Sequence, residues 1–252
     1  MKIGLSLFTL REYTARDFDE VLGKVKALGY DGVEFAGYGD VPADVMKGYL
    51  EKHGLEQTSC HVSLPDLMGE KLDQVIEYNK AIGNKNIVCA WAPMANEEEF
   101  QQTVAALKEV AAKLMENGMQ LYYHNHAHEF EFKHEGKSGF ECMMDDLFTP
   151  EELRPEADMF WVWKGGACPV DITERYGNRT TIWHMKDGIV NDEGNIEFRI
   201  SGQGCVGFDK VIEAADKTTI EWLIVENDMP YPEGYYVVGR SADYFKEQLS
   251  KL

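Results

Sequence analysis

The chain contains one complete strand–helix–strand unit in NIVCAW (86–91), NEEEFQQTVAALKEVAAKLMENG (96–118) and QLYYHN (120–125). This unit indicates the fold class. Its first and last segments contain few charges and are rich in β-branched or aromatic residues, as in strands buried on both faces. The middle segment begins at Asn96, a predicted N-cap with three glutamates in the following turn, and ends at Gly118. Such alternation predicts an α/β fold.

The same alternation extends over the whole chain. Helical patterns at 15–29 and 66–83 lie between strands, and glycine follows the helices at Gly29, Gly54, Gly83 and Gly118. The predicted strands are KIGLSL (2–7), GVEF (32–35), QTSCHV (57–62), NIVCAW (86–91), QLYYHN (120–125), PEADMF (155–160), TTIWHM (180–185) and WLIVEN (222–227).

Eight such strands in 252 residues predict a single (β/α)8 TIM barrel that spans residues 1–252 as one domain. The alternative is a doubly wound open sheet, but LFTLREY (7–13) follows the first strand where that fold carries a glycine-rich phosphate loop. Two long connections, 125–139 and 186–207, follow strands, so we expect them on the catalytic face of a barrel.

Composition excludes several classes of partner. The 25 Lys and Arg against 44 Asp and Glu leave a formal charge of −19, which disfavours nucleic acid and anionic lipid. No apolar run approaches the ~18 residues of a membrane span, and the N-terminus resembles a first strand more than a signal peptide. The five cysteines include no C-x-x-C pair, so we expect a reducing cytoplasm and no thiolate zinc site.

Ionisable residues stand near the ends of six predicted strands, and in a barrel these ends converge on one axis. Imidazoles together with carboxylates suit one divalent ion, with Mn²⁺, Zn²⁺, Fe²⁺ or Co²⁺ favoured over Mg²⁺. Each residue alone has a plain structural explanation: a carboxylate such as Glu34 can satisfy neighbouring polar groups, and a lone histidine can belong to the core. The six residues are Glu34, His61, His124, Asp158, His184 and Glu226.

The segment YYHNHAHEFEFKHEG (122–136) holds four of the seven histidines. If the strand continues through His126, then His124 and His126 point to the same face, and they could share a metal or divide metal and substrate between them. For His128 and His134 an exposed polar loop is the favoured interpretation.

Five motifs in this order resemble the sugar phosphate isomerase/epimerase family of xylose isomerase-like TIM barrels, to which endonuclease IV is related. The resemblance covers nearly the whole chain, including LGYDGVEFAG (28–37). The motifs are YHNHAHEF (123–130), ADMFWVWKGGACPV (157–170), RTTIWHMKDG (179–188), SGQG (201–204) and WLIVEND (222–228).

The resemblance implies one divalent metal held by a Glu, an Asp, a His and a second Glu. Carried over by position, the last three are Asp158, His184 and Glu226, and His124 stands in the place of the first Glu, where the family has E-N-H and this chain has H-N-H. With this departure, the first of the two glutamates through which the family's epimerases exchange a proton is missing. A second departure is Cys168-Pro169, where the family often has Asp-Pro.

The remaining expected roles also follow the family pattern. Glu226 is the first candidate for the base, with His126 or Glu129 in place of the missing glutamate. Lys186 is expected to steady an oxyanion or, with equal weight, to form a salt bridge with Asp187 or another acidic residue at the rim. Residues expected to face substrate are Glu34, His61, Glu129, Trp161 and Gln203. For Trp161, as for Trp91 and Trp163, packing is the favoured role. A plain glycine-rich turn would also explain Gln203.

The resemblance implies an enzyme that isomerises or epimerises a sugar, phosphorylated or not, through an enediolate formed by removing a proton next to a carbonyl. Dehydration or β-elimination of a keto-inositol or keto-glycoside uses the same chemistry and stays open. So does a non-catalytic barrel that binds a sugar or a metal. A small sugar is the expected partner, and Arg240 is the one residue that points to a phosphate on it. Barrels of this class often form homodimers. The negative charge disfavours a nuclease.

Overall fold

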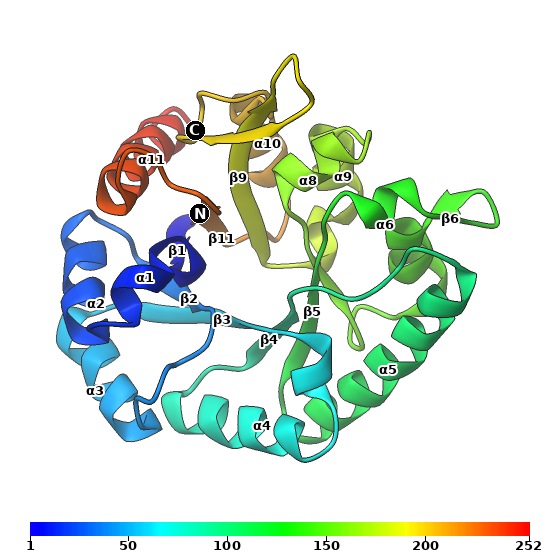
Figure 1. Cartoon of the computed structure of the whole chain (residues 1–252), viewed down its shortest axis with the longest axis horizontal. Coiled ribbons are helices and arrows are strands. Elements are labelled where there is room, and N and C mark those ends of the chain that lie inside the picture. Colours follow the sequence, from blue (N-terminus) through cyan, green and yellow to red (C-terminus); the bar gives the residue numbers. More distant parts are fainter.

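A barrel of parallel strands forms the centre of the protein, and helices surround it (Figure 1). The computed structural model describes residues 1–252, and all eight predicted strands are present in it, so the predicted barrel is confirmed. The barrel strands are β1 (Lys2–Ser6), β2 (Gly32–Phe35), β3 (Glu56–Val62), β4 (Asn86–Cys89), β5 (Gln120–His124), β8 (Arg154–Glu156), β9 (Ile182–Val190) and β11 (Trp222–Glu226).

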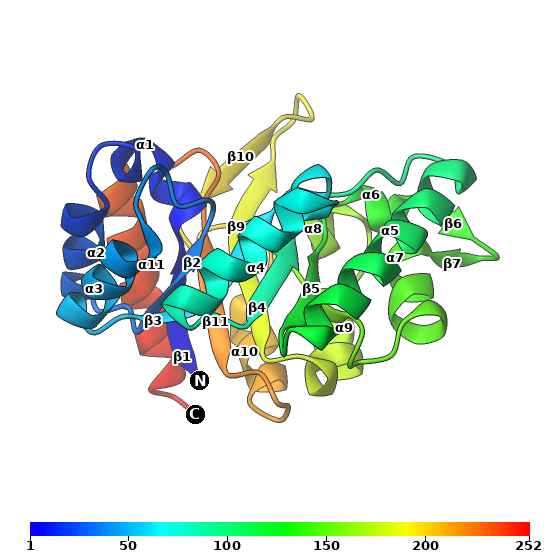
Figure 2. The same cartoon turned by 90° about the horizontal axis from the view of Figure 1, so that it is seen from below.

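The sheet closes between β8 and β9, which excludes the open-sheet alternative. Its strands follow the order β9-β11-β1-β2-β3-β4-β5-β8, and all these pairs are parallel. The two ends meet in a parallel bridge between Asp158 and His184, where the His184 amide donates to the Ala157 carbonyl at 3.0 Å. An added strand, β10 (Ile196–Arg199), pairs antiparallel with the long end of β9 and projects beyond the barrel (Figure 2).

The helices begin and end where the sequence places caps. Asp17 accepts the Glu20 amide at the start of α2, and Asn96 accepts the Glu99 amide at the start of α5, as predicted for Asn96. Gly83 ends α4 in the left-handed region at φ 84°, which a glycine adopts without strain. The long helices are α2 (Phe18–Ala27), α3 (Ala43–His53), α4 (Glu70–Ile82), α5 (Glu97–Glu116), α9 (Pro169–Tyr176), α10 (Phe208–Ala215) and α11 (Gly234–Leu249).

Short elements occupy the connections. The segment 125–139 folds into α6 and a small hairpin, and a π-helical turn over Cys142–Leu147 follows α7. No helix combines the length and the apolar character that a membrane span requires. The short elements are α1 (Arg11–Thr14), α6 (His128–Glu131), β6 (Lys133–His134), β7 (Lys137–Ser138), α7 (Gly139–Glu141) and α8 (Met159–Lys164), with 3₁₀ turns at Leu7–Leu10, Leu64–Leu67 and Gly177–Arg179.

The sixth strand is shorter than predicted. We expected a strand over 155–160, but β8 ends at Glu156 and α8 begins at Met159. The cause is Asp158, whose carboxylate accepts the Trp161 amide at 3.0 Å and so caps the helix. The prediction for the end of this segment was therefore wrong, although Asp158 still lies at the carboxyl end of the barrel.

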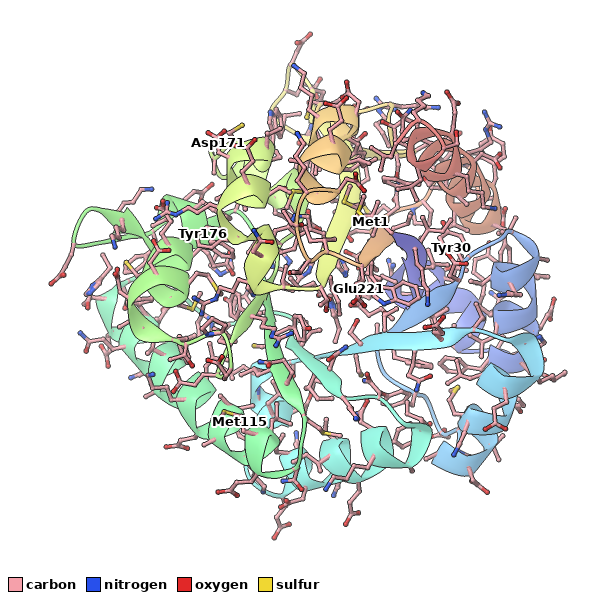
Figure 3. The ribbon with its side chains drawn as sticks, turned by 180° about the vertical axis from the view of Figure 1, so that it is seen from behind. Met1, Tyr30, Met115, Asp171, Tyr176 and Glu221 are labelled. Carbon is pink, nitrogen blue, oxygen red and sulfur yellow. The ribbon has the colours of Figure 1, made fainter.

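Apolar side chains fill the amino end of the barrel. Five of them form a cluster separate from the main core between barrel and helices: Val88, Tyr122, Ile182, Trp222 and Ile224. Figure 3 shows this end from behind, with Met1 and Glu221 close together where β1 and β11 begin, next to the bond that the Lys2 amide donates to the Glu221 carbonyl at 2.7 Å. Function must therefore be sought at the opposite, carboxyl end.

Candidate active site at the carboxyl end of the barrel

Alternation along the strands turns every second side chain toward the barrel axis. On β9 these are His184 and Lys186, and on β11 it is Glu226, whereas Met185 and Val225 belong to the main core outside the barrel. The six ionisable residues predicted at strand ends all gather at the carboxyl end.

Four of them form a compact set, which we name the upper group: His124, Asp158, His184 and Glu226. One donor atom from each lies within 4.8 Å of the others, and none of the four is more than 4% exposed. His184 Nδ1 lies 3.2 Å from Glu226 Oε2, and His124 Nε2 lies 3.9 Å from Asp158 Oδ2. The structure thus brings together the four residues that the family pattern indicates as metal ligands.

A second set lies next to it, and we name Glu34, His61, Glu156 and His184 the lower group. His61 Nε2 lies 2.7 Å from Glu156 Oε2 and 3.1 Å from Glu34 Oε1. His184 Nε2 lies 2.8 Å from Glu34 Oε1, and the Ser59 hydroxyl donates to Glu34 Oε2 at 2.7 Å. Glu34 and His61 were expected to face substrate. Glu34 does not line the main cavity and contacts this group, whereas His61 contacts this group and also lines the cavity.

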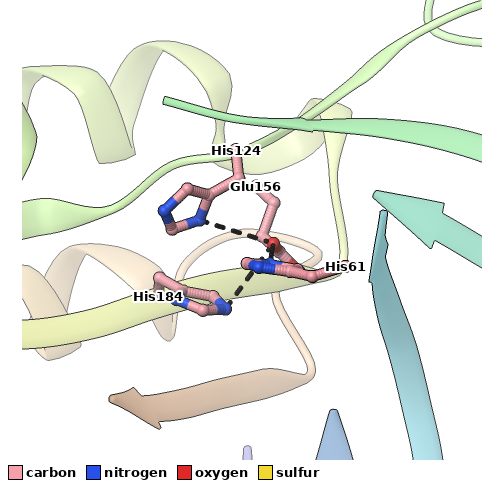
Figure 4. A group of neighbouring side chains, drawn as sticks. All are labelled: His61, His124, Glu156 and His184. Atoms are coloured by element: carbon pink, nitrogen blue, oxygen red, sulfur yellow. Dashed lines mark hydrogen bonds and ion pairs between the residues drawn. The ribbon is translucent and has the colours of Figure 1, made fainter. Parts of the chain in front are cut away.

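Glu156 was missed by the sequence analysis. Its carboxylate lies among the rings of His61, His124 and His184 (Figure 4), and no part of it is exposed. A sign of it was available, because Glu156 stands two residues before Asp158 in a predicted strand and must share its face. The segment was too weakly apolar for that face to be recognised as the inside of the barrel.

The two carboxylates of the lower group divide charge and proton between them. Burial opposes the charge on Glu34, but His184 and His61 outweigh it and lower its pKa to about 2. Burial and the neighbouring Glu34 charge raise the pKa of Glu156 to about 8. Near neutral pH the pair therefore holds one negative charge and one proton.

The carboxylates of the upper group are also set apart by their surroundings. Burial raises the pKa of Asp158 to about 6, despite the nearby Lys186 ammonium. Burial opposes the charge on Glu226 as well, but Lys186 and His184 outweigh it and hold the pKa of Glu226 well below its usual range. Glu226 therefore keeps its negative charge to a lower pH than Asp158 does.

Lys186 is almost completely buried beside the upper group, at 2% exposure. Its Nζ lies 2.8 Å from Glu226 Oε2, 3.3 Å from Asp158 Oδ2 and 3.0 Å from Asp228 Oδ1. Asp228 was not predicted as a site residue, although it stands two residues after Glu226. The expected alternative partner Asp187 turns away and accepts backbone amides of 188, 202, 204 and 206.

A cavity of about 580 Å³ opens beside these groups. Phe8, Val62 and Trp91 give it an apolar wall, and Trp91 is 48% exposed at this position. The polar lining includes His61, His124, His126, Lys186, Glu226 and Asp228. The strand β5 ends at His124 and does not continue through His126, but both imidazoles line the cavity.

Two residues expected at the substrate lie behind this lining. Glu129 is fully buried and accepts the Tyr123 hydroxyl and the His126 amide, each at 2.8 Å, so it holds the loop that carries His126. Trp161 packs with its ring 5.3 Å from that of His126 and 5.5 Å from Lys186 Nζ. Both contact lining residues without lining the cavity.

Gln203 lies elsewhere. It is exposed and lines a separate shallow depression together with Arg240, so neither residue borders the main cavity. The glycine-rich turn that carries Gln203 is held by the amide bonds to Asp187 described above. His128 and His134 are half-buried on the surface loop, bonded to the Ala92 carbonyl and the Glu97 carboxylate.

The upper group fits a divalent transition metal. It offers two imidazoles and two carboxylates, a mixed nitrogen and oxygen donor set. Asp158 Oδ2 is buried and accepts no hydrogen bond, and apart from the 3.3 Å ion pair with Lys186 Nζ it is open to an ion. His124, Asp158, His184 and Glu226 would hold the ion, with Lys186 beside it.

Comparison with known proteins assigns the chain to a family of the same fold. The family model described as xylose isomerase-like TIM barrel matches residues 22–248. An inosose dehydratase of Geobacillus kaustophilus is 25% identical over 93% of this chain and 87% of its own length. One of Clostridium beijerinckii is 19% identical over 92% of this chain and 89% of its own.

Solved structures agree on the fold. A sugar phosphate isomerase/epimerase from Parabacteroides distasonis has a TM-score of 0.82 at 22% identity, with 98% of each chain covered. The probable 3-DHS dehydratase AsbF from Bacillus anthracis has a TM-score of 0.79 at 15% identity, covering 98% of this chain and 99% of that one. The IOLI protein, solved with a zinc atom, has a TM-score of 0.76 at 16% identity, covering 100% and 99%.

Proposed function

The chain belongs to the xylose isomerase-like TIM barrel family, and on that premise we propose that it is a metal-dependent lyase of a small keto-polyol. It removes a proton next to a carbonyl and expels the oxygen on the following carbon, as in dehydration of a keto-inositol or β-elimination from a keto-glycoside. The observation that carries the proposal is the 2.8 Å contact between Lys186 Nζ and Glu226 Oε2 in the cavity lining.

Glu226 is the proposed base. It lines the cavity and remains a carboxylate, because the Lys186 ammonium lies against it. A bound divalent ion would supply the stabilisation of the enediolate oxygens. The C–H bond breaks, its proton passes to the Glu226 carboxylate, and the electron pair remains on the substrate.

Lys186 is the proposed acid. As the electron pair forms the new C=C bond, the C–O bond breaks and Lys186 donates a proton to the departing oxygen, which leaves as water or as an alcohol. Glu226 is then protonated and Lys186 neutral. A proton transfer across their 2.8 Å contact restores both groups, so the step balances without a further reactant.

Two observations support elimination over isomerisation. The curated relatives named above are inosose dehydratases, and an inosose is a keto-inositol. The place of the family's first glutamate is taken by His124, and Glu129 lies behind the cavity lining, so the chain lacks the two facing glutamates that proton exchange in the epimerases uses.

Isomerisation or epimerisation of a keto-sugar is the second candidate, and the position of His126 favours it. This imidazole lines the same cavity as Glu226 from another strand end. Burial, and then the charge of Lys186, lowers its pKa to about 3, so it is a neutral base at pH 7. With Glu226 it could exchange protons on two sides of a substrate.

The test uses the Mn²⁺-loaded protein with a keto-inositol and a 3-keto-glucoside in deuterated water, followed by proton NMR. Elimination predicts loss of the α-proton together with an unsaturated ketone and released water or alcohol. Deuterium incorporation or a new stereoisomer without elimination would support the second candidate instead. Bound metal without either reaction would contradict both and leave a binding protein.

A further inference from the structure

Resting on the metal site proposed above, we infer that Glu34 and Glu156 are positioning residues for that ion. Glu34 faces Nε2 of His184, and Glu156 faces Nδ1 of His124. The other nitrogen of each ring, Nδ1 of His184 and Nε2 of His124, then presents its lone pair to one ion in the upper group. The lower group is therefore a support for the ligands and does not bind a second ion.

The two ring nitrogens of His184 face different carboxylates. Nε2 lies 2.8 Å from Glu34 Oε1, and Nδ1 lies 3.2 Å from Glu226 Oε2. A neutral imidazole has one N–H and one lone pair, and the bond at the N–H decides which nitrogen can bind a metal. Glu34 accepts from Nε2 and so leaves Nδ1 as the ligand. Glu34 is itself fixed by the Ser59 hydroxyl.

His124 repeats the arrangement more loosely. Its Nδ1 lies 3.6 Å from Glu156 Oε2, and its Nε2 lies 3.9 Å from Asp158 Oδ2. The first distance exceeds a hydrogen bond, so Glu156 acts on this ring by electrostatics. His61 holds Glu156 in place with a contact of 2.7 Å. We therefore expect Glu34 to matter more than Glu156.

The donor count argues against two ions. A second ion would have to use His61, His124, Glu156 and His184, and two of these, His124 and His184, also belong to the upper group. Filling both sites would require both shared rings to bind metal through both nitrogens, and each would have to lose its remaining N–H. His61 Nε2 already joins the two carboxylates of the lower group, so this nitrogen is engaged without an ion.

The experiment measures metal binding without substrate. Metal-stripped wild type, Glu34→Gln and Glu156→Gln are titrated with Mn²⁺ and Co²⁺ by calorimetry, and bound metal is counted by elemental analysis. Asp187→Asn is the matched control, because Asp187 is an equally buried carboxylate next to Lys186 that accepts only backbone amides. Circular dichroism checks that each variant folds.

We expect one ion per wild-type chain and a Kd raised ~10–100-fold by Glu34→Gln. Glu156→Gln should raise it less, and Asp187→Asn should leave it unchanged. The visible spectrum of bound Co²⁺ should change in Glu34→Gln, since the ring that ligates the ion is no longer held. Two ions in the wild type, with one lost in Glu156→Gln, would overturn the inference, and so would an unchanged Kd in Glu34→Gln.

A measurement on the wild type covers the case in which Glu34→Gln does not fold. Nitrogen-15 NMR of the Zn²⁺-loaded protein reports the tautomer of His184, and we expect the proton on Nε2 and the metal on Nδ1. The opposite tautomer would overturn the inference. A wild type that performs the elimination with an unchanged Kd in Glu34→Gln would refute the inference alone, whereas a wild type that binds no ion would refute it together with the proposed function.

Discussion

The two ends of the barrel interior are built from the same strands and differ in chemistry. Along β9 the inward positions change from Ile182 to His184 and Lys186. Along β11 they change from apolar Trp222 and Ile224 to charged Glu226, which lies at the other end of the same strand.

The difference separates stability from function. The amino end buries apolar surface at roughly 25 cal/mol per Å², which favours the folded state. The carboxyl end buries charges that would be costly unless they were paired. Those charges are compensated locally, Lys186 by three carboxylates and Glu34 by two imidazoles, which is typical of a site kept for chemistry.

The largest expected effect comes from Glu226→Gln, which removes the proposed base from the carboxyl end. Because an amide does not accept the proton, we expect α-proton loss to slow ~10²–10⁴-fold. The measurement is proton NMR of the keto-polyol, with metal content determined on the same sample. Full activity with retained metal would rule out the role of Glu226 as base.

Lys186→Gln tests the division between proton abstraction and elimination. Without the ammonium, departure of the substrate oxygen should slow ~10²-fold or more, whereas exchange of the α-proton with solvent continues at a smaller loss. The ratio of the two rates, measured in deuterated water, is the readout. An equal loss of both rates would assign Lys186 to metal or substrate binding and remove it as the acid.

At the amino end we expect a substitution to lower stability and to leave metal binding unchanged. Ile224→Ala removes part of the apolar cluster and should lower the free energy of unfolding by ~2–5 kcal/mol. Below the melting transition the Kd for Mn²⁺ should not change. Urea denaturation and calorimetry measure the two quantities, and a weakened metal site in the folded variant would show that the two ends are coupled.

The smallest effect is expected from Gly4→Ala. The added Cβ would lie 2.6 Å from Ile224 Cδ1, so the cluster must shift, at a cost of ~1–3 kcal/mol. A lower midpoint of urea denaturation with unchanged activity would show that β1 also serves stability at the amino end and not function. No loss of stability would mean that the isoleucine side chain adjusts freely.

Sequence reasoning brought the members of the upper group to one end of the barrel, because each of them stands near the end of a predicted strand. Its failures concern contacts between strands. Glu156 and Asp228 were overlooked, since their partners His61 and Lys186 are 95 and 42 residues distant. Glu129 looked like a catalytic residue in a histidine-rich loop, yet it folds back onto Tyr123 and the His126 amide.

The sequence by itself determined the barrel, because alternating strands and helices with their caps are local patterns that each segment carries alone. It also indicated six of the ionisable residues at the carboxyl end, although not Glu156 or Asp228. Only the tertiary structure decided how those residues divide into two groups, that Lys186 contacts Glu226, and that Gln203 lies away from the cavity. The physical reason is that charge pairing and burial depend on distances across the barrel, which no segment specifies before the sheet closes between β8 and β9.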